Sequence, residues 1–411
     1  MVRENIFKQF KDKRHDLVKD KTVLQSSYHP QDLLHREEQI QLIAEYIDCA
    51  LRGERPSNLL CIGKTGTGKT ATIGFIGSQL KEMDTKMENC QFMHINCAIA
   101  DSPYTIVSEL SDSIISEPSE RIPQTGLGLD TVISNLTDYM ERCRRIFIIA
   151  LDEIDMASTK NGNSILYYLL SMNDGLKDSG ISVIGITNNT KFPETLNAKV
   201  HSRLNEVKII FPPYGPSEIT DILTARAELA FDKDVLAEGV IPYIAALTSK
   251  NGGDARVAIE MLRMSADIAE RNGDSSVTEA HVRSAKDIME LDAVAETIKT
   301  LNLQSKIVLM SVLKNFEEGM NLMTTGEVYS QYCRICEAVA VSPVTQRRVG
   351  DLISELDMLG LIYARTRSFG RSGRTKEIEL SVSRNSLEML ESDPLFDNLS
   401  EYRSPKQTRL I

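Results

Sequence analysis

The stretch Gly63-Lys64-Thr65-Gly66-Thr67-Gly68-Lys69-Thr70 has the residue types and spacing needed to hold a chain of phosphates. It matches G-x-x-x-x-G-K-[ST], in which backbone N–H groups curl around phosphate oxygens, Lys69 reaches the β- and γ-phosphates and the Thr70 hydroxyl binds Mg²⁺. An apolar run at 59–62 precedes it and a helix-forming run at 71–76 follows it, so the loop would also gain the partial positive charge of a helix N-terminus. A glycine-rich turn without a ligand is the alternative, and the strand–loop–helix context favours nucleotide binding.

An acidic pair, Asp152-Glu153, follows an apolar run at 145–151 that predicts a strand buried on both faces. Asp152 is placed to hold Mg²⁺ through water, and Glu153 to orient and polarise the attacking water. An acidic pair can also end a strand in solvent, but its occurrence together with the glycine loop favours the metal site. Hydrolysis, as distinct from binding, depends on Glu153.

Two further side chains could monitor the bound phosphates. Asn188 follows the strand-like run 181–186 and could hold the attacking water or sense the third phosphate. Arg256 lies in the first turn of an amphipathic helix, from which it could swing onto a phosphate and couple a lid to the nucleotide. Each has an ordinary alternative, because Asn188-Asn189 is typical of a turn and Arg256 of a solvated helix face.

The elements that would position these side chains fall into three parts and a tail. Residues 1–212, which begin with a basic segment, alternate strand-like runs with helical patterns, and this predicts an α/β domain with a doubly wound parallel sheet. Residues 213–294 are helical throughout and predict a lid domain. Residues 295–392 combine helices with two strand-like runs, and residues 393–411 predict a flexible tail. The predicted strands of the sheet are 59–62, 91–95, 146–151, 181–186 and 207–210.

The region 295–392 has the pattern of a helix-turn-helix followed by a basic β-hairpin. Its hairpin tip, 364–376, carries five basic residues and no acid, which predicts a winged helix that binds double-stranded DNA. Such a domain can also be a protein–protein module, and basic loops often serve only solubility. The DNA-contact candidates are Thr345, Gln346, Arg347, Arg348, Arg365, Arg367, Arg371, Arg374 and Lys376.

Composition limits the class of protein. The 411 residues are 42% hydrophobic and 26% charged, and no apolar run approaches the roughly 18 residues of a membrane span, so a cytoplasmic, nucleoid-associated protein is expected. Seven scattered cysteines suit a reducing compartment, and Cys333-Arg-Ile-Cys336 is expected to pack in a core. The net charge of −11 lies mainly in the middle of the chain, because residues 1–21 and 345–384 both carry more basic than acidic side chains.

The motifs resemble those of AAA+ ATPases, with 63–70 as Walker A, 148–153 as Walker B, Thr187-Asn188 as sensor 1 and 253–256 as sensor 2. Further stretches narrow the resemblance to the archaeal replication initiators, which are similar to the largest subunit of the origin recognition complex and to the cell-division-cycle helicase loader. Those stretches are Asn5-Ile6-Phe7, Leu34-His35-Arg36-Glu37-Glu38-Gln39, Phe211-Pro212-Pro213-Tyr214 and Gly253-Asp254-Ala255-Arg256.

The resemblance implies ligands and partners that the residues alone do not show. It implies ATP or ADP with Mg²⁺ as ligands, and origin DNA, the minichromosome-maintenance helicase and other initiator copies as partners, with no membrane. It also places Tyr214 and Arg226 at the nucleotide, and makes 28–30 with His35-Arg36 the walls of the adenine pocket.

The resemblance extends to contacts with neighbouring molecules. Arg203 lies where an arginine finger would act on the ATP of a neighbouring subunit, with Lys199 as a weaker candidate. Residues 98–129 lie where initiators carry a helical insertion that touches DNA.

Together these features predict a slow ATPase used as a switch. ATP would bridge the α/β domain and the lid, Arg256 would report the γ-phosphate, and hydrolysis through Glu153 would relax the grip on DNA or release the helicase. Two other functions stay open. One is a clamp-loader-type or helicase-type motor with fast turnover, and the other is a nucleotide-regulated transcription factor or a paralogue that does not act at origins.

Overall fold

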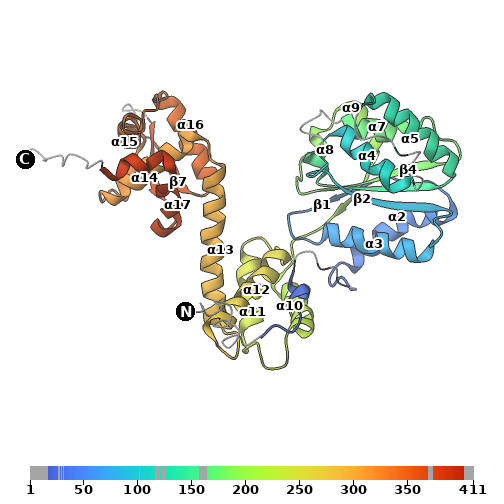
Figure 1. Ribbon diagram of the computed structural model, residues 1–411, viewed down its shortest axis with the longest axis horizontal. Helices are drawn as coiled ribbons and strands as arrows, with labels where there is room; N and C mark the ends of the chain where they lie inside the picture. The colour runs from blue at the N-terminus through green and yellow to red at the C-terminus, as the bar shows by residue number, and fades with distance from the viewer. Residues whose placement is uncertain are drawn as a thin grey trace, which may run out of the picture. The chain divides into compact units, whose positions relative to one another are not determined.

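The computed structural model describes residues 17–25, 28, 30, 32–100, 102–115, 121, 126–156, 164–368 and 374–401 (Figure 1). The chain divides into two compact units, Met1–Val282 and Arg283–Ile411. The first unit contains a five-stranded sheet with its helices and a helical lid, and the second contains helices with a three-stranded sheet. None of the described helices combines the length and the apolar character needed to cross a membrane.

Five parallel strands form the sheet of the first unit, in the order β2-β3-β4-β1-β5. They are β1 (Leu59–Ile62), β2 (Cys90–Asn96), β3 (Ile146–Asp152), β4 (Gly180–Thr187) and β5 (Val207–Ile210). Every residue of β1, β3 and β4 is buried, because helices cover both faces of the sheet. The predicted doubly wound parallel sheet is therefore confirmed. In such sheets ligands bind beyond the carboxyl ends of the strands, which is where the glycine loop follows β1.

Two apolar layers hold the sheet between its helices (Figure 1). One layer lies under α2 (Glu37–Ile47) and α3 (Lys69–Met83). The other lies under α4 (Pro103–Ile114), α5 (Leu129–Cys143), α7 (Ser164–Met172) and α9 (Ala198–Leu204), and the short α8 (Phe192–Thr195) adds Phe192 to it. The two faces are closed by α2 and α3 on one side and by the four longer helices on the other, so polar side chains are free to gather only at the strand ends.

The lid consists of three helices, α10 (Pro216–Ala230), α11 (Val240–Lys250) and α12 (Ala255–Asn272). The described part of the N-terminal segment, residues 17–25, packs on this lid through a short 3-10 turn, η1 (Lys21–Leu24), which contacts α10 and α12. Val18 pairs with Phe231 in an isolated antiparallel bridge. From the sequence, this segment was predicted to belong to the α/β domain. Its packing on α10 and α12 corresponds to no recognisable pattern in the sequence.

The second unit is organised around α14 (Leu303–Glu317), α15 (Thr325–Ala338) and α16 (Gln346–Met358). An antiparallel sheet in the order β6-β8-β7 packs beside them, formed by β6 (Met323–Thr324), β7 (Ile362–Ser368) and β8 (Arg374–Leu380). A capping box starts α15, with Thr324 and Glu327 bonded to each other's backbone N–H groups. Helix α13 (Glu279–Thr300) spans the boundary between the two units.

The first residues of the segment predicted as a flexible tail, 393–411, form a described helical element that follows the winged-helix region. Short helical turns cover 384–391, and η5 (Pro394–Glu401) follows them. Phe396 is buried in the core of the second unit, and Asp393 accepts a hydrogen bond from Lys306 at 2.7 Å. One aromatic anchor and one ion pair leave no periodic pattern, so neither contact could be predicted from the sequence. Residues 402–411 lie outside the described residues.

Candidate functional site

The glycine loop, residues 63–70, joins the carboxyl end of β1 to the first turn of α3. Gly66 (φ 65°) and Gly68 (φ 86°) adopt left-handed backbone, which glycine reaches without steric cost. A Cβ atom on Gly63 would lie 2.4 Å from the carbonyl oxygen of Phe211, so no larger residue fits there. The loop leads directly into the N-terminus of α3. The first N–H groups of this helix have no partner within the helix and can donate hydrogen bonds to an anion.

Lys69 folds back into this loop and is only 5% exposed. Its Nζ donates hydrogen bonds to the carbonyl oxygens of Gly63 (2.7 Å) and Lys64 (2.6 Å) and to Asn188 Oδ1 (2.7 Å). Burial is the largest influence on this ammonium and lowers the pKa of Lys69 to about 8, and the charge of Arg256 acts in the same direction. The structure thus brings the loop lysine and the amide after β4 into contact.

Thr70 and Asp152 form the pair of oxygen donors predicted for Mg²⁺. Thr70 Oγ1 donates to Asp152 Oδ2 at 2.7 Å, and Asp152 lies buried at the end of β3. Burial alone would raise the pKa of Asp152, but the nearby His94 imidazole and the hydrogen bond from Thr70 outweigh it and hold the pKa below its ordinary value. An ionised carboxylate beside a hydroxyl is the kind of donor set that Mg²⁺ prefers, so these residues fit the ion.

His94 is a neighbour of this pair that the sequence did not reveal. Its Nε2 lies 3.6 Å from Asp152 Oδ2. The residue sits on β2, which pairs in parallel with β3 and brings His94 opposite Ala150. Only the strand order, with β2 at the edge beside β3, could have identified it.

Glu153 follows Asp152 with a φ of 51°, a left-handed backbone that is uncommon for residues other than glycine. Its N–H donates to Asp152 Oδ1 at 3.0 Å, and this bond helps to orient the Asp152 carboxylate. Two residues further on, Asp155 accepts a hydrogen bond from Thr187 Oγ1 at 2.8 Å. That bond ties the end of β3 to the end of β4 directly before Asn188.

The lid reaches the glycine loop through the turn that precedes α12. The Ala255 N–H donates to the carbonyl oxygen of Gly66 at 3.2 Å. Asp254 caps α12 by accepting from the Arg256 N–H at 2.9 Å, and a Cβ on Gly66 would lie only 1.7 Å from Asp254 Oδ1. Arg256 is exposed beside this turn, near enough for its charge to lower the pKa of Lys69. The predicted sensor arginine therefore lies on the side of the lid that faces the loop.

Arg36 and Tyr214 also adjoin the loop, in a way that the sequence did not predict. Arg36 is 2% exposed and donates from Nε to the carbonyl oxygen of Thr67 at 2.8 Å. Its guanidinium lies 3.8 Å from the centre of the Tyr214 ring, and a Cβ on Gly68 would meet the Tyr214 hydroxyl at 2.6 Å. Arg36 was expected in a wall of the adenine pocket, but its charge is enclosed by the chain's own groups. Tyr214 lies beside the loop, and its predicted contact with the nucleotide stays a prediction.

Arg226, which was expected at the nucleotide, is engaged elsewhere. Its Nη1 donates to the carbonyl oxygen of Val23 at 3.0 Å, and its guanidinium stacks 4.3 Å from the centre of the Tyr28 ring. Both partners belong to the N-terminal segment, which the sequence had not placed on the lid. A nucleotide contact of Arg226 stays a prediction, and His29 lies outside the described residues.

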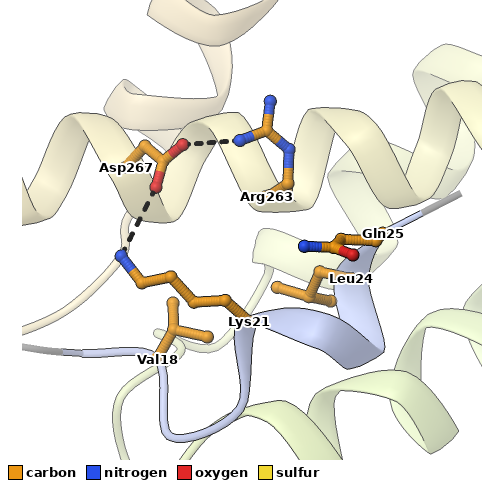
Figure 2. Close-up of a pocket in the computed structure, with 6 residues that line it drawn as sticks. All are labelled: Val18, Lys21, Leu24, Gln25, Arg263 and Asp267. Atoms are coloured by element: carbon orange, nitrogen blue, oxygen red, sulfur yellow. Dashed lines mark hydrogen bonds and ion pairs between the residues drawn. The ribbon is translucent and has the colours of Figure 1, made fainter. Parts of the chain in front are cut away.

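A pocket of about 290 Å³ lies where the N-terminal segment meets α12 (Figure 2). Its lining residues are Val18, Lys21, Leu24, Gln25, Arg263 and Asp267. The charges in it are already paired, because Asp267 accepts from Arg263 Nη1 at 2.8 Å and lies 3.8 Å from Lys21 Nζ. The buried Glu270 holds the same segment by accepting from Lys21 Nζ at 2.6 Å. The pocket is thus part of the attachment of the segment to the lid.

Arg203, the candidate arginine finger, lies at the end of α9. Its Nη1 donates to Asp174 Oδ2 at 2.9 Å, and its guanidinium lies 5.5 Å from the centre of the Tyr167 ring. The ion pair is partly exposed, so it is easily exchanged for another partner. Lys199 is exposed on the same helix. The described parts of the expected DNA insertion form α4 and the start of α5, and residues 116–120 and 122–125 lie outside the described residues.

The predicted DNA-binding residues of the second unit divide into two groups. Thr345 caps α16 by accepting from the Arg348 N–H. Gln346, Arg347 and Arg348 are all exposed in the first turn, and Arg348 lies 3.6 Å from Glu355. In the wing, Arg365 stacks on Tyr363, Arg367 donates to Glu377 and Lys376 donates to the carbonyl oxygen of Gly350 at 2.8 Å. Lys376 therefore fastens β8 to α16. Arg371 lies outside the described residues, and of Arg374 only its place in β8 is described.

Three family models match the chain in succession. The ATPase family associated with various cellular activities (AAA) matches residues 59–212, the Cdc6 AAA+ ATPase-type lid domain 220–287, and the CDC6 C-terminal winged helix domain 296–389. They confirm the predicted fold class of α/β domain, lid and winged helix. The exact domain bounds stay predictions.

Curated relatives and a solved structure point to the same family. The chain is 45% identical to the ORC1-type DNA replication protein of Pyrococcus abyssi, over 90% of this chain and 89% of the relative. It is 44% identical to ORC1-type DNA replication protein 1 of Methanosarcina acetivorans, over 89% of this chain and 88% of the relative. The Aeropyrum pernix ORC1 protein, solved in complex with DNA, is 38% identical with a TM-score of 0.79, covering 93% of this chain and 99% of that one.

Proposed function

Since the chain belongs to the family of archaeal ORC1/Cdc6-type AAA+ replication initiators with a winged-helix domain, we propose that it is an ATP-dependent initiator that binds double-stranded origin DNA and helps to load the minichromosome-maintenance helicase. ATP binding and slow hydrolysis would act as the switch. Nucleotide binding is a property of the AAA+ family.

One observation supports nucleotide binding most directly: side chains from separate elements contact each other at the glycine loop. Lys69 reaches Asn188, and Thr70 reaches Asp152, across 119 and 82 positions of the sequence. When phosphates enter the loop, the Lys69 ammonium exchanges its carbonyl partners for phosphate oxygens, and the N–H groups at the start of α3 hold them. Thr70 and Asp152 would hold Mg²⁺, which supplies neutralisation of phosphate charge.

Hydrolysis is assigned to Glu153 with Asn188. Glu153 would act as the base that orients the attacking water, because it directly follows Asp152 at the end of β3. Asn188 would hold the same water or the γ-phosphate once Lys69 has released its amide oxygen. Arg256 would report the γ-phosphate from the lid, because it already lies beside the loop.

DNA binding is supported by the winged-helix match and by the DNA complex of the Aeropyrum pernix relative. The exposed Gln346 and Arg347 in the first turn of α16 would face base edges, and the wing would follow the phosphate backbone. Lys376 would serve the wing by holding β8 against α16.

The helicase and further initiator copies are the other proposed partners. A finger role in trans would require Arg203 to leave Asp174, and a partly exposed pair of this kind contributes about 0–1 kcal/mol. The cost of releasing Arg203 is therefore small compared with a contact to a phosphate.

Mapping where the protein sits on the genome tests the proposed function in cells. The wild type is expected at a few intergenic sites from which replication starts, and Lys69→Ala is expected to lose ATP binding and change that occupancy. Occupancy scattered over promoters, with no relation to replication starts, would favour a nucleotide-regulated transcription factor.

A further inference from the structure

The chain passes between the α/β domain and the lid at two places. Residues 17–25 lie on the lid, and α2 begins on the sheet at Glu37. Farther along, β5 ends in the sheet at Ile210, and α10 begins the lid at Pro216. The described residues of these two connections are 28, 30 and 32–36 in the first and 211–215 in the second, and a movement of the lid relative to the sheet would act on both.

One buried side chain joins both passages to the glycine loop. The three nitrogens of Arg36 donate to the carbonyl oxygens of His35 (2.6 Å), Thr67 (2.8 Å) and Pro212 (2.7 Å). His35 belongs to the first passage, Thr67 to the loop and Pro212 to the second passage. No other residue type could do this, because only a guanidinium offers a planar set of donors pointing in several directions.

Tyr214 extends this junction to the lid. Its ring stacks on the Arg36 guanidinium, and its N–H donates to the carbonyl oxygen of Gly253 at 3.3 Å, directly before the turn that carries Asp254 and Arg256. A Cβ on Gly253 would lie 2.4 Å from the carbonyl oxygen of Tyr214, so the two segments are in close contact.

The first passage is fastened to the lid as well. His35 Nε2 lies 2.8 Å from Asp221 Oδ2 on α10. Arg36 therefore links the glycine loop, which would hold phosphate, to both connections of the lid, and the lid carries Arg256. Burial lowers the pKa of Arg36, yet the side chain stays charged and is balanced by carbonyl oxygens and an aromatic face.

We propose that Arg36 is a positioning residue that couples the conformation of the glycine loop to the hinge of the lid, so that Arg256 contributes to ATP affinity only when Arg36 is in place. This inference rests on the proposed nucleotide binding at the same loop. It assigns Arg36 no contact with the nucleotide.

The test is a double-mutant cycle on ATP affinity, with Arg36→Lys, Arg256→Ala and the double variant. Lysine keeps the charge but cannot reach three carbonyl oxygens at once, so Arg36→Lys is expected to weaken ATP binding about tenfold or more, as for a lost charge-assisted hydrogen bond. Arg256→Ala is expected to weaken ATP binding clearly in the wild-type background and less than about twofold in the Arg36→Lys background. A residue that only supports the fold would leave the two effects multiplicative.

Arg52→Lys is the matched control, because Arg52 is an exposed arginine whose partner is Asp48. It is expected to bind ATP as the wild type does. If Arg36→Lys does not fold, as judged by thermal unfolding, Tyr214→Leu removes the stacked ring and replaces it in the cycle, with the same loss of coupling expected. Wild-type affinity in the Arg36 variant, or fully multiplicative effects, would overturn the inference while ATP binding by the wild type stands. Absence of ATP binding by the wild type would overturn the proposed function and this inference together.

Discussion

Lys69 carries its charge in surroundings that disfavour it. Burial lowers its pKa to about 8, whereas phosphate oxygens would favour the charged form and raise the pKa again. ATP binding is therefore expected to take up a proton at pH 8 and above, and ATP affinity is expected to fall by up to about tenfold per pH unit above 8. Below pH 7, Lys69 is already charged and contributes no pH dependence.

Calorimetric titration with ATP at pH 7, 8 and 9, in two buffers of different ionisation enthalpy, measures this uptake directly. The Arg52→Lys variant, whose substitution lies away from the loop, serves as the control. An ATP affinity that stays constant from pH 7 to pH 9, with no proton exchanged, would contradict the assigned state of Lys69.

Glu153 separates binding from hydrolysis. Glu153→Gln keeps the size of the side chain and the backbone turn but removes the base. Hydrolysis is expected to slow by about 10²–10⁴-fold, while ATP affinity changes little. Single-turnover hydrolysis together with equilibrium ATP binding measures both, and a variant that hydrolyses ATP at the wild-type rate would take the base assignment away from Glu153.

Whether a residue of this site could be predicted from the sequence depends on the kind of contact that it makes. The loop, Asp152 and Asn188 could be predicted because phosphate and Mg²⁺ demand particular side chains at the ends of apolar strands. Arg36 could not, because its partners are main-chain carbonyl oxygens, which every residue has, and one of them lies 176 positions away. The contact of Arg226 with the N-terminal segment could not be predicted for a similar reason, since its partner is the carbonyl oxygen of Val23.

At the scale of elements, the wing and α16 form one structure through Lys376. Its ammonium reaches the carbonyl oxygen of Gly350 and the Ser354 hydroxyl of α16. The five basic residues of the wing therefore do not share one task, although they look alike in the sequence. Lys376 is expected to serve stability, and Arg371 and Arg374 DNA affinity.

Two wing variants separate these tasks. Arg371→Ala with Arg374→Ala is expected to weaken DNA binding on every sequence and to reduce the slope of log affinity against log salt by about 2, one unit per lost phosphate contact. Lys376→Met keeps the aliphatic stem and is expected to lower stability by about 1 kcal/mol. DNA binding across a salt series and thermal unfolding measure the two effects. A salt slope that Arg371→Ala with Arg374→Ala leaves unchanged would remove the wing from the DNA.

The helices and strands were largely predictable from the sequence, but the contacts between distant segments were not. Each of the five predicted strands is present. The strands β1, β3 and β4 were the most predictable, because apolar runs buried on both faces leave few other folds. The attachment of 17–25 to the lid depends on Glu270, which accepts from the backbone N–H groups of Leu17 and Val18. A contact with one buried carboxylate more than 250 positions away leaves no local pattern in the sequence, so this attachment could not be predicted.

For the whole molecule, the central claim is that the nucleotide at the glycine loop governs the hold on DNA. The groups that would transmit this signal lie within the first unit, where Arg256, Asp254 and Arg36 connect the lid to the loop. A protein that only used ATP as a structural ligand would bind DNA equally well with ATP and with ADP.

The most direct measurement is an electrophoretic binding assay on origin DNA with ATP or ADP, using the wild type, Lys69→Ala and Arg256→Ala. We expect tighter DNA binding with ATP than with ADP for the wild type, and equal binding with the two nucleotides for both variants. Equal DNA affinity of the wild type with ATP and ADP, or a nucleotide effect that survives in Lys69→Ala, would contradict the central claim.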